Sequence, residues 1–184
     1  APKREIMMIE LVNGGTRSGK SRYAEQMALA TTAQTHFYIA TAQALDAEMA
    51  ARIAHHQSTR DECWQLLETP LRLAQPLPDH CSSTTGVVVD CLTLWMTNLL
   101  LAGADICASE LATLLQSLPR LPGTIYLVSN ETSMGVVPLD PLSRQFVDEA
   151  GRLHQQLAVI CDRVTLMVAG IPLSIKNNVI NKNP

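Results

Sequence analysis

A short run near the start of the sequence has the residue types and the spacing needed to hold a chain of phosphates. Residues 14–21 fit the pattern G-x-x-x-x-G-K-[ST], in which backbone N–H groups surround phosphate oxygens at the N-terminus of a helix. Lys20 is expected to reach the outer phosphates of a triphosphate, and the Ser21 hydroxyl to help hold Mg²⁺. A glycine-rich turn without a ligand is the alternative, which the apolar run before the motif and the helix-forming residues after it disfavour. The predicted binding residues are Gly14, Gly15, Thr16, Arg17, Ser18, Gly19, Lys20 and Ser21.

Two acidic residues follow apolar runs further along the chain. A site of this kind needs an acid at the end of a neighbouring strand to orient Mg²⁺ or its water. Asp90 follows the run 86–89 and is the first candidate, and Glu131, after the run 125–129, is the second. Asp90 could instead cap the helix expected near Leu92. The two roles are compatible, and we favour the metal-side role, partly through water.

Two adjacent histidines, His55 and His56, end a stretch over 45–56 in which apolar residues recur every four positions. At about 100° per residue, His56 falls on the apolar stripe, whereas His55 points roughly a third of a turn away. His56 is therefore expected to pack and His55 to be freer, with Arg52 three residues before it. A free imidazole near a nucleotide can serve as general base, hydrogen-bond donor or nucleophile on phosphorus. An exposed histidine without a role fits the pattern equally well.

The elements that must position these residues alternate along the chain. Strands are expected at 6–12, 36–41, 64–67, 86–90, 124–129 and 164–168, and helices at 21–30, 45–56, 92–101, 109–118 and 141–161, the last containing Gly151. Prolines at 70, 76 and 78 predict turns, and a break is expected at 103–105. This alternation predicts an α/β fold of the P-loop NTPase type, a mainly parallel sheet with helices on both faces. We expect one catalytic nucleotide-binding domain over 1–184, with a frayed tail at 177–184.

The composition is that of a globular chain. Its 184 residues are 47% hydrophobic and 17% charged, and the net charge of -3 gives no broad reason to expect nucleic acid or an anionic membrane as partner. No segment reads as a signal peptide or as a bilayer-spanning helix, so a cytoplasmic protein is expected. The five cysteines are scattered without a C-x-x-C pair, which favours ordinary thiols over zinc ligands or disulfides.

Several segments, in this order, resemble one known family. The sequence is similar to the bifunctional adenosylcobinamide kinase/adenosylcobinamide-phosphate guanylyltransferases of cobalamin biosynthesis, over about residues 8–176. The R-I-A-H-H and N-E-x-x-M-G-V-V-P segments are more specific than the phosphate loop, and Ser133 stands where a glycine is more usual. The matching segments are N-G-G-T-R-S-G-K-S-R-Y-A-E (13–25), Y-I-A-T-A (38–42), E-M-A-A-R-I-A-H-H (48–56), V-V-V-D-C-L-T-L-W-M-T-N-L-L (87–100), S-N-E-T-S-M-G-V-V-P (129–138) and V-A-G-I-P (168–172).

The resemblance implies two reactions at one nucleotide site, with ATP and GTP as substrates and Mg²⁺ as cofactor. The first phosphorylates the aminopropanol hydroxyl of adenosylcobinamide. The second transfers GMP from GTP to that phosphate through a covalent GMP–histidine intermediate, and the matching residue is His55. Lys20 is expected to serve both reactions, because both need the bound triphosphate. The resemblance also implies a homotrimer. The further nucleotide contacts that it implies are Ala40, Thr41, Ala42, His56, Gln57, Ser58, Thr59, Glu68 and Asp90.

Two other functions fit the residues themselves. The chain could be a P-loop kinase of small molecules with one activity, in which His55 only binds phosphate, or a nucleotide-dependent binding module without covalent chemistry. The histidine pair favours the bifunctional enzyme, because a simple kinase does not need it.

Overall fold

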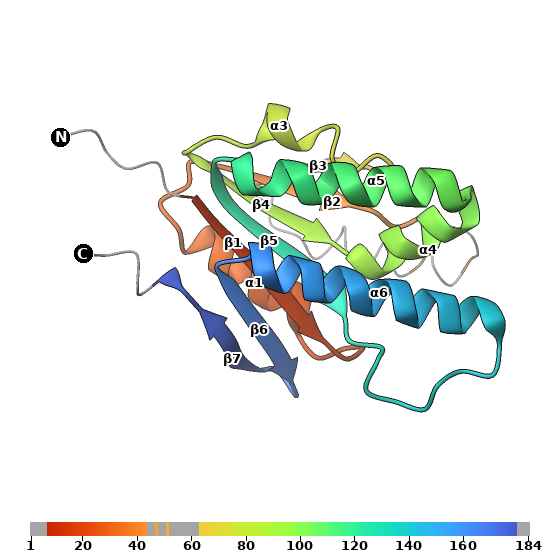
Figure 1. Ribbon diagram of the computed structural model, residues 1–184. Helices are drawn as coiled ribbons and strands as arrows, with labels where there is room; N and C mark the ends of the chain where they lie inside the picture. Colours follow the sequence, from red (N-terminus) through yellow and green to blue (C-terminus); the bar gives the residue numbers. More distant parts are fainter. Residues whose placement is uncertain (1–6, 44–46, 48–50, 52–62, 180–184) are drawn as a thin grey trace.

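A computed structural model describes residues 7–43, 47, 51 and 63–179 of the chain. Within these residues, seven strands form one sheet in the order β3-β2-β4-β5-β1-β6-β7 (Figure 1), and only the β6–β7 pair is antiparallel. This confirms the predicted α/β fold with a mainly parallel sheet. The strands are β1 (Met7–Gly14), β2 (Thr35–Ala40), β3 (Trp64–Glu68), β4 (Thr85–Asp90), β5 (Gly123–Asn130), β6 (Arg163–Val168) and β7 (Ile171–Asn177).

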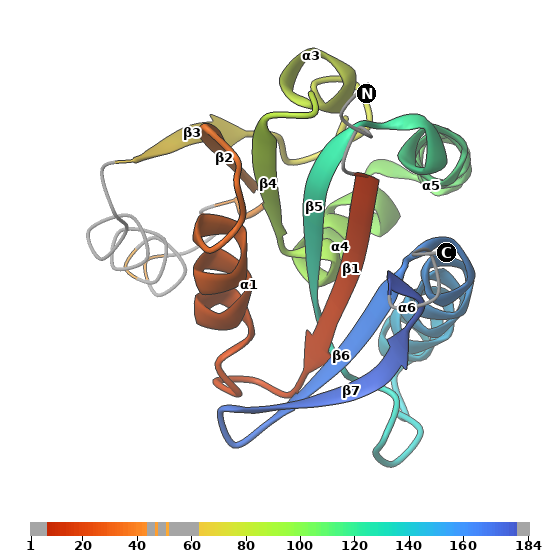
Figure 2. The same cartoon turned by 90° about the vertical axis from the view of Figure 1, so that its left-hand side faces the viewer.

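Helices cover both faces of the sheet. Among the described helices, Figure 2 shows α1 on one face, and α4, α5 and α6 on the opposite face. The helix α1 packs against β1, β4 and β5, and α6 lies across β1 and contacts α4 and α5. The helices are α1 (Lys20–Leu29), α3 (Leu77–His80), α4 (Leu92–Ala102), α5 (Ala104–Ser117) and α6 (Pro141–Ile160), with one 3-10 turn at Leu118–Arg120.

The core has two layers because side chains of a strand alternate between the faces of the sheet. In β4, Val87 and Val89 are fully buried beneath α4 and α5, whereas Val88 is buried in the layer under α1. Strands buried on both faces read as continuous apolar runs, which is why 86–90 and 124–129 were recognisable as strands without any polar alternation.

The carboxyl ends of the parallel strands meet at one edge of the sheet. Because β5 lies between β1 and β4, Gly14 pairs with Asn130, while Asp90 pairs with Val128 and, on its other side, with Ala40. Ala40 in turn pairs with Glu68. The sheet thus brings the phosphate loop and three of the predicted nucleotide contacts to the same edge.

The strand prediction was wrong at the end of the chain, where β7 follows the expected last strand. The sequence of β7 does alternate, with apolar residues at Ile171, Leu173 and Ile175, and this signal was not recognised as a strand. Nearly all side chains of β7 are exposed. It ends at Asn177, where the tail was expected to begin, and the Asn178 N–H donates to the Asp162 carbonyl (2.9 Å).

Two helices also differ from expectation. The helix predicted over 109–118 begins at Ala104, because Gly103 alone makes the break, with a φ of 114°. The short α3 lies in the proline-rich stretch that predicted only turns, and Pro78 is tolerated there in its first turn. Apart from positions 47 and 51, the amphipathic stretch expected over 45–56 lies outside the described residues.

Candidate nucleotide-binding site

The phosphate loop joins β1 to α1 and needs glycine at two positions. Gly19 has a φ of 92° and caps α1, a conformation that a side chain would strain. At Gly14 a Cβ atom would lie 2.6 Å from the Met167 carbonyl oxygen, so any larger residue would push β6 away. Arg17 also has a positive φ, and the Ser18 N–H closes the loop by donating to the Gly15 carbonyl (3.2 Å). The loop is therefore a tight nest of backbone amides at a helix N-terminus.

Lys20 is the buried cation of the loop. Its side chain is 7% exposed, and its Nζ donates to the Gly15 carbonyl at 2.6 Å. Burial lowers the pKa of the Lys20 ammonium, and the nearby Asp90 and Cys91 partly oppose that shift. A triphosphate in the loop would give this desolvated ammonium anionic partners in place of a single carbonyl.

Asp90 lies at the end of β4 and does not cap the next helix. The N-cap of α4 is Cys91, whose Sγ accepts the Leu94 N–H (3.4 Å). The capping alternative for Asp90 is thus wrong. Its Oδ2 instead accepts a 2.5 Å hydrogen bond from the Tyr38 hydroxyl, which fixes the carboxylate beside the phosphate loop.

The predicted contacts on β2 and β3 are held by hydrogen bonds across the sheet edge. Thr41 is fully buried, its Oγ1 donates to the Cys91 carbonyl (2.6 Å), and it accepts the Cys91 N–H (2.9 Å). The Thr69 N–H donates to the Ala40 carbonyl (2.8 Å), next to the exposed Glu68. Ala42, the residue after Thr41, is half-buried. This part of the edge is therefore a fixed wall next to the loop.

The residues present fit a magnesium ion carried by the nucleotide. In the part of the chain that the structure describes, no three His, Cys, Asp or Glu side chains are grouped so that they could hold a metal. Mg²⁺ is commonly held by one or two protein oxygens, substrate phosphates and water, so it needs no such cage. Ser21 in the first turn of α1 and Asp90 at the end of β4 provide one hydroxyl and one carboxylate.

The histidine pair and the residues after it, which carry the predicted covalent chemistry, lie outside the described residues. They are His55, His56, Gln57, Ser58 and Thr59.

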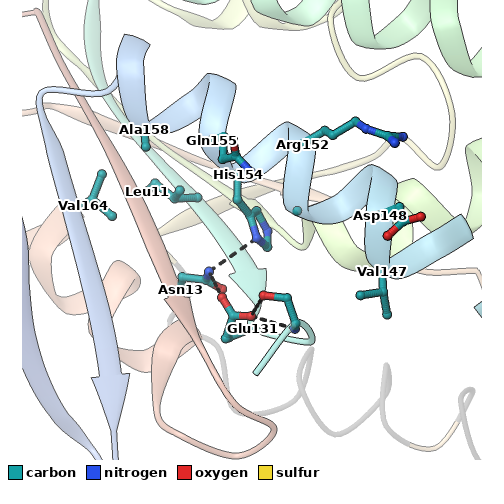
Figure 3. A pocket seen from close by; sticks show the side chains of 12 residues that line it. Leu11, Asn13, Glu131, Val147, Asp148, Arg152, His154, Gln155, Ala158 and Val164 are labelled. Atoms are coloured by element: carbon teal, nitrogen blue, oxygen red, sulfur yellow. Dashed lines mark hydrogen bonds between the residues drawn. The ribbon is translucent and has the colours of Figure 1, made fainter. Parts of the chain in front are cut away.

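A hydrogen-bonded group behind the loop was missed in the sequence (Figure 3). The Asn13 side chain accepts the Gly14 N–H (3.0 Å), and its Nδ2 donates to Glu131 Oε2 (3.0 Å) and lies 3.5 Å from His154 Nδ1. His154 Nε2 lies 2.7 Å from Ser129 Oγ. Only Glu131 was a candidate, as a second acid, because the other members are far apart in sequence.

Burial and hydrogen bonding shift the pKa values of His154 and Glu131 in this group. Burial lowers the pKa of the His154 imidazole, and the Glu131 carboxylate only partly offsets that shift. For Glu131, burial favours the protonated form, but hydrogen bonds from Ser133 and Asn13 and the nearby His154 outweigh it, so its pKa is lowered. The group is therefore a neutral imidazole beside a carboxylate that stays ionised.

A cavity of about 660 Å³ opens between this group and α6. Asn13, Glu131 and His154 form the polar part of its wall next to the loop, and Leu11 and Val164 an aliphatic part (Figure 3). The other polar residues of the lining are Ser133, Asp148, Arg152 and Gln155. It lies at the carboxyl ends of β1 and β5, on the face of the sheet opposite α1, where α/β folds bind their ligands.

The fold and the loop define a P-loop nucleotide-binding enzyme. Among solved structures, the chain is similar in fold to a prototypical ATPase from the type III secretion system of pathogenic bacteria, with a TM-score of 0.58 at 12% identity, over 95% of this chain and 57% of the ATPase. More narrowly, the chain belongs to the cobinamide kinase / cobinamide phosphate guanyltransferase family, whose model matches residues 10–175. The resemblance in the motifs is thereby confirmed.

Individual relatives are similar in sequence to the chain over almost their whole length. The chain is 52% identical to the bifunctional adenosylcobalamin biosynthesis protein CobP of Pseudomonas aeruginosa, over 92% of this chain and 98% of that protein. It is 40% and 43% identical to the CobU proteins of Escherichia coli and Salmonella typhimurium, over 92% of this chain and all of each relative. The chain is a bifunctional kinase and guanylyltransferase of adenosylcobalamin biosynthesis. Within its described residues, none of the helices has the length and apolarity to cross a bilayer.

Proposed function

We propose that both reactions use the phosphate loop, and that the second passes through a GMP adduct on His55. The shared use of the loop rests on the meeting of the loop, the buried Lys20 and Asp90 at one sheet edge. The role of His55 rests on the family resemblance. In a chain of this family, that edge has the parts needed to hold the triphosphate for both reactions.

In the kinase reaction, the hydroxyl oxygen of the aminopropanol arm attacks the γ-phosphorus of the triphosphate. A new O–P bond forms, the bond from the γ-phosphorus to the bridging oxygen breaks, and the hydroxyl proton is released. The loop amides and Lys20 stabilise the negative charge that moves to the leaving diphosphate. Mg²⁺, held by Ser21 and Asp90 partly through water, would neutralise the phosphate charge.

In the guanylyl reaction, a neutral His55 nitrogen attacks the α-phosphorus of GTP. A P–N bond forms and the bond to pyrophosphate breaks, with Lys20 beside the leaving group. An oxygen of the phosphorylated acceptor then attacks the same phosphorus, the P–N bond breaks, and adenosylcobinamide-GDP is formed. The segments 40–42 and 56–59, with Glu68, are proposed to contact the nucleotide.

We further propose that the protein is cytoplasmic and works as a homotrimer. The support for both is the family resemblance, together with a composition that gives no sign of a membrane or nucleic acid partner. The mass in solution tests the trimer directly.

The covalent step is tested with GTP labelled at its α-phosphate. The protein is incubated with the labelled GTP and Mg²⁺ and then denatured, and it should carry an acid-labile, alkali-stable label. We expect the label to disappear in His55→Ala, to survive in the matched control His56→Ala, and to be lost with both activities in Lys20→Ala. Absence of the label in the unaltered protein would leave a kinase without a covalent intermediate.

A further inference from the structure

The cavity under α6 adjoins the phosphate loop but takes no part in binding the nucleotide as proposed above. Asn13, in its wall, accepts the N–H of the first loop residue, Gly14. Glu131, also in the wall, donates its backbone N–H to the Gly14 carbonyl (2.9 Å). The cavity is therefore one residue away from the loop, on the face of the sheet that α1 does not cover.

A glycine in the middle of α6 indicates that the cavity has a function. Gly151 is the eleventh of the twenty residues of this helix and lines the cavity. Glycine weakens a helix interior relative to alanine, because it loses more backbone entropy on folding. Here neither backbone nor packing requires it, since its φ is not positive and an added Cβ would meet no atom within 4 Å. What a side chain at this position would do is enter the cavity.

We propose that the cavity between α6 and the carboxyl ends of β1 and β5 binds the hydroxyl-bearing aminopropanol arm of the acceptor, and that Gly151 keeps it open. This inference rests on the proposed function of the phosphate loop. A volume of about 660 Å³ lies within the usual range for small-molecule sites. The volume exceeds what an arm of a few heavy atoms needs, so the arm can enter while the corrin ring stays outside.

The chemistry of the walls matches that arm. The Oε1 atom of Glu131 accepts from the Ser133 N–H and hydroxyl, whereas Oε2 accepts only from Asn13 among the described residues. A carboxylate oxygen has two lone pairs, so Oε2 can accept a further hydrogen bond from a substrate hydroxyl. Leu11 and Val164 provide an aliphatic surface for the methyl group of the arm.

The position of Glu131 is fixed independently of any ligand. Asn13 donates to its carboxylate and is itself held by the Gly14 N–H, and His154 lies on the other side of the Asn13 amide. A hydroxyl bound at Oε2 would thus have a defined position relative to the loop that holds the terminal phosphate. Such prior orientation of two reactants is a major source of rate enhancement.

The test fills the cavity from Gly151. Equilibrium dialysis measures the Kd for adenosylcobinamide in the full-length protein and in Gly151→Ala, Gly151→Leu and the control Gln156→Leu, an exposed position of α6 outside the cavity lining. We expect the Kd to rise in the order Ala, Leu, by roughly tenfold or more for leucine, and to stay unchanged in the control. Thermal unfolding should show no loss of stability, since alanine and leucine are better helix formers than glycine.

Two results would overturn the inference. One is an unchanged Kd in folded Gly151→Leu, and the other is a change in its solution mass, which would make the cavity a contact between copies of the chain. Covalent labelling by GTP needs no acceptor, so it tests the proposed function independently of the cavity. If the unaltered protein is labelled and Gly151→Leu still binds the corrinoid normally, only the cavity assignment fails.

Discussion

A buried amide in α4 links two of the segments proposed to contact the nucleotide. Asn98 is 6% exposed, and its Nδ2 donates to the Thr41 carbonyl (2.8 Å) and to the Pro70 carbonyl (2.9 Å). The first carbonyl lies just after β2 and the second just after β3. Replacing Asn98 by leucine, which has nearly the same shape, removes both hydrogen bonds while filling the same space.

The size of the effect follows from the burial of the two carbonyls. Each hydrogen bond contributes about 0.5–1.5 kcal/mol net, and a fully buried carbonyl left without a donor costs about 1–3 kcal/mol. Thr41 is fully buried, whereas Pro70 is half-buried and water can partly replace its donor. We therefore expect Asn98→Leu to lower the free energy of unfolding by about 2–4 kcal/mol.

Urea unfolding checks this value. For a chain of this size the denaturant slope is about 2 kcal/mol per M, so the midpoint should fall by about 1–2 M. The control is Thr97→Val, which removes only a bond to the Thr93 carbonyl within the same helix and should cost under about 1 kcal/mol. Binding of GTP should weaken in Asn98→Leu at urea-free, fully folded conditions. Stability within about 0.5 kcal/mol of the unaltered protein would refute the reasoning.

Two further outcomes are expected. Tyr23→Phe removes the hydroxyl that donates to the buried Glu10 (3.0 Å), and should lower the free energy of unfolding by about 1–2 kcal/mol in urea; an unchanged midpoint would contradict this. The pKa of His154 is lowered in the folded protein from its usual 6.5, so the unfolded chain binds more protons below that value and stability falls as the pH drops through it. His154→Gln should flatten this fall between about pH 7.5 and about pH 5.5, and an equally steep fall in the variant would assign the protons to other groups.

The phosphate loop and the main strands could be predicted because their signals are local. The pattern from Gly14 to Ser21 spans eight residues, and its flanking strand and helix are adjacent in sequence. The arrival of Asp90 at the same edge also followed, because parallel strands in such folds end together. The sequence could not show that Asp90 does not cap α4, because this depends on Cys91 being the N-cap residue.

The group around the cavity could not be read from the sequence for a physical reason. Asn13 is 118 residues from Glu131 and 141 residues from His154. The pairing of β1 with β5 brings Glu131 to Asn13, and the packing of α6 on β1 brings His154. Gly151 was visible as a glycine inside a predicted helix, but its meaning depends on the space around it. By contrast, the alternation of Ile171, Leu173 and Ile175 in β7 was visible in the sequence, although these side chains stay exposed and the strand forms by pairing with β6.

The turn between β6 and β7 is tied to the phosphate loop, since the Gly170 N–H donates to the Ser18 carbonyl at 3.0 Å. This amide belongs to the last hairpin of the chain, yet its protection from solvent exchange depends on the conformation of a loop about 150 residues earlier. A nucleotide that orders the loop should slow hydrogen exchange at Gly170 without touching it. The hairpin thus serves as a built-in reporter of site occupancy, which can be read without any corrinoid or any turnover.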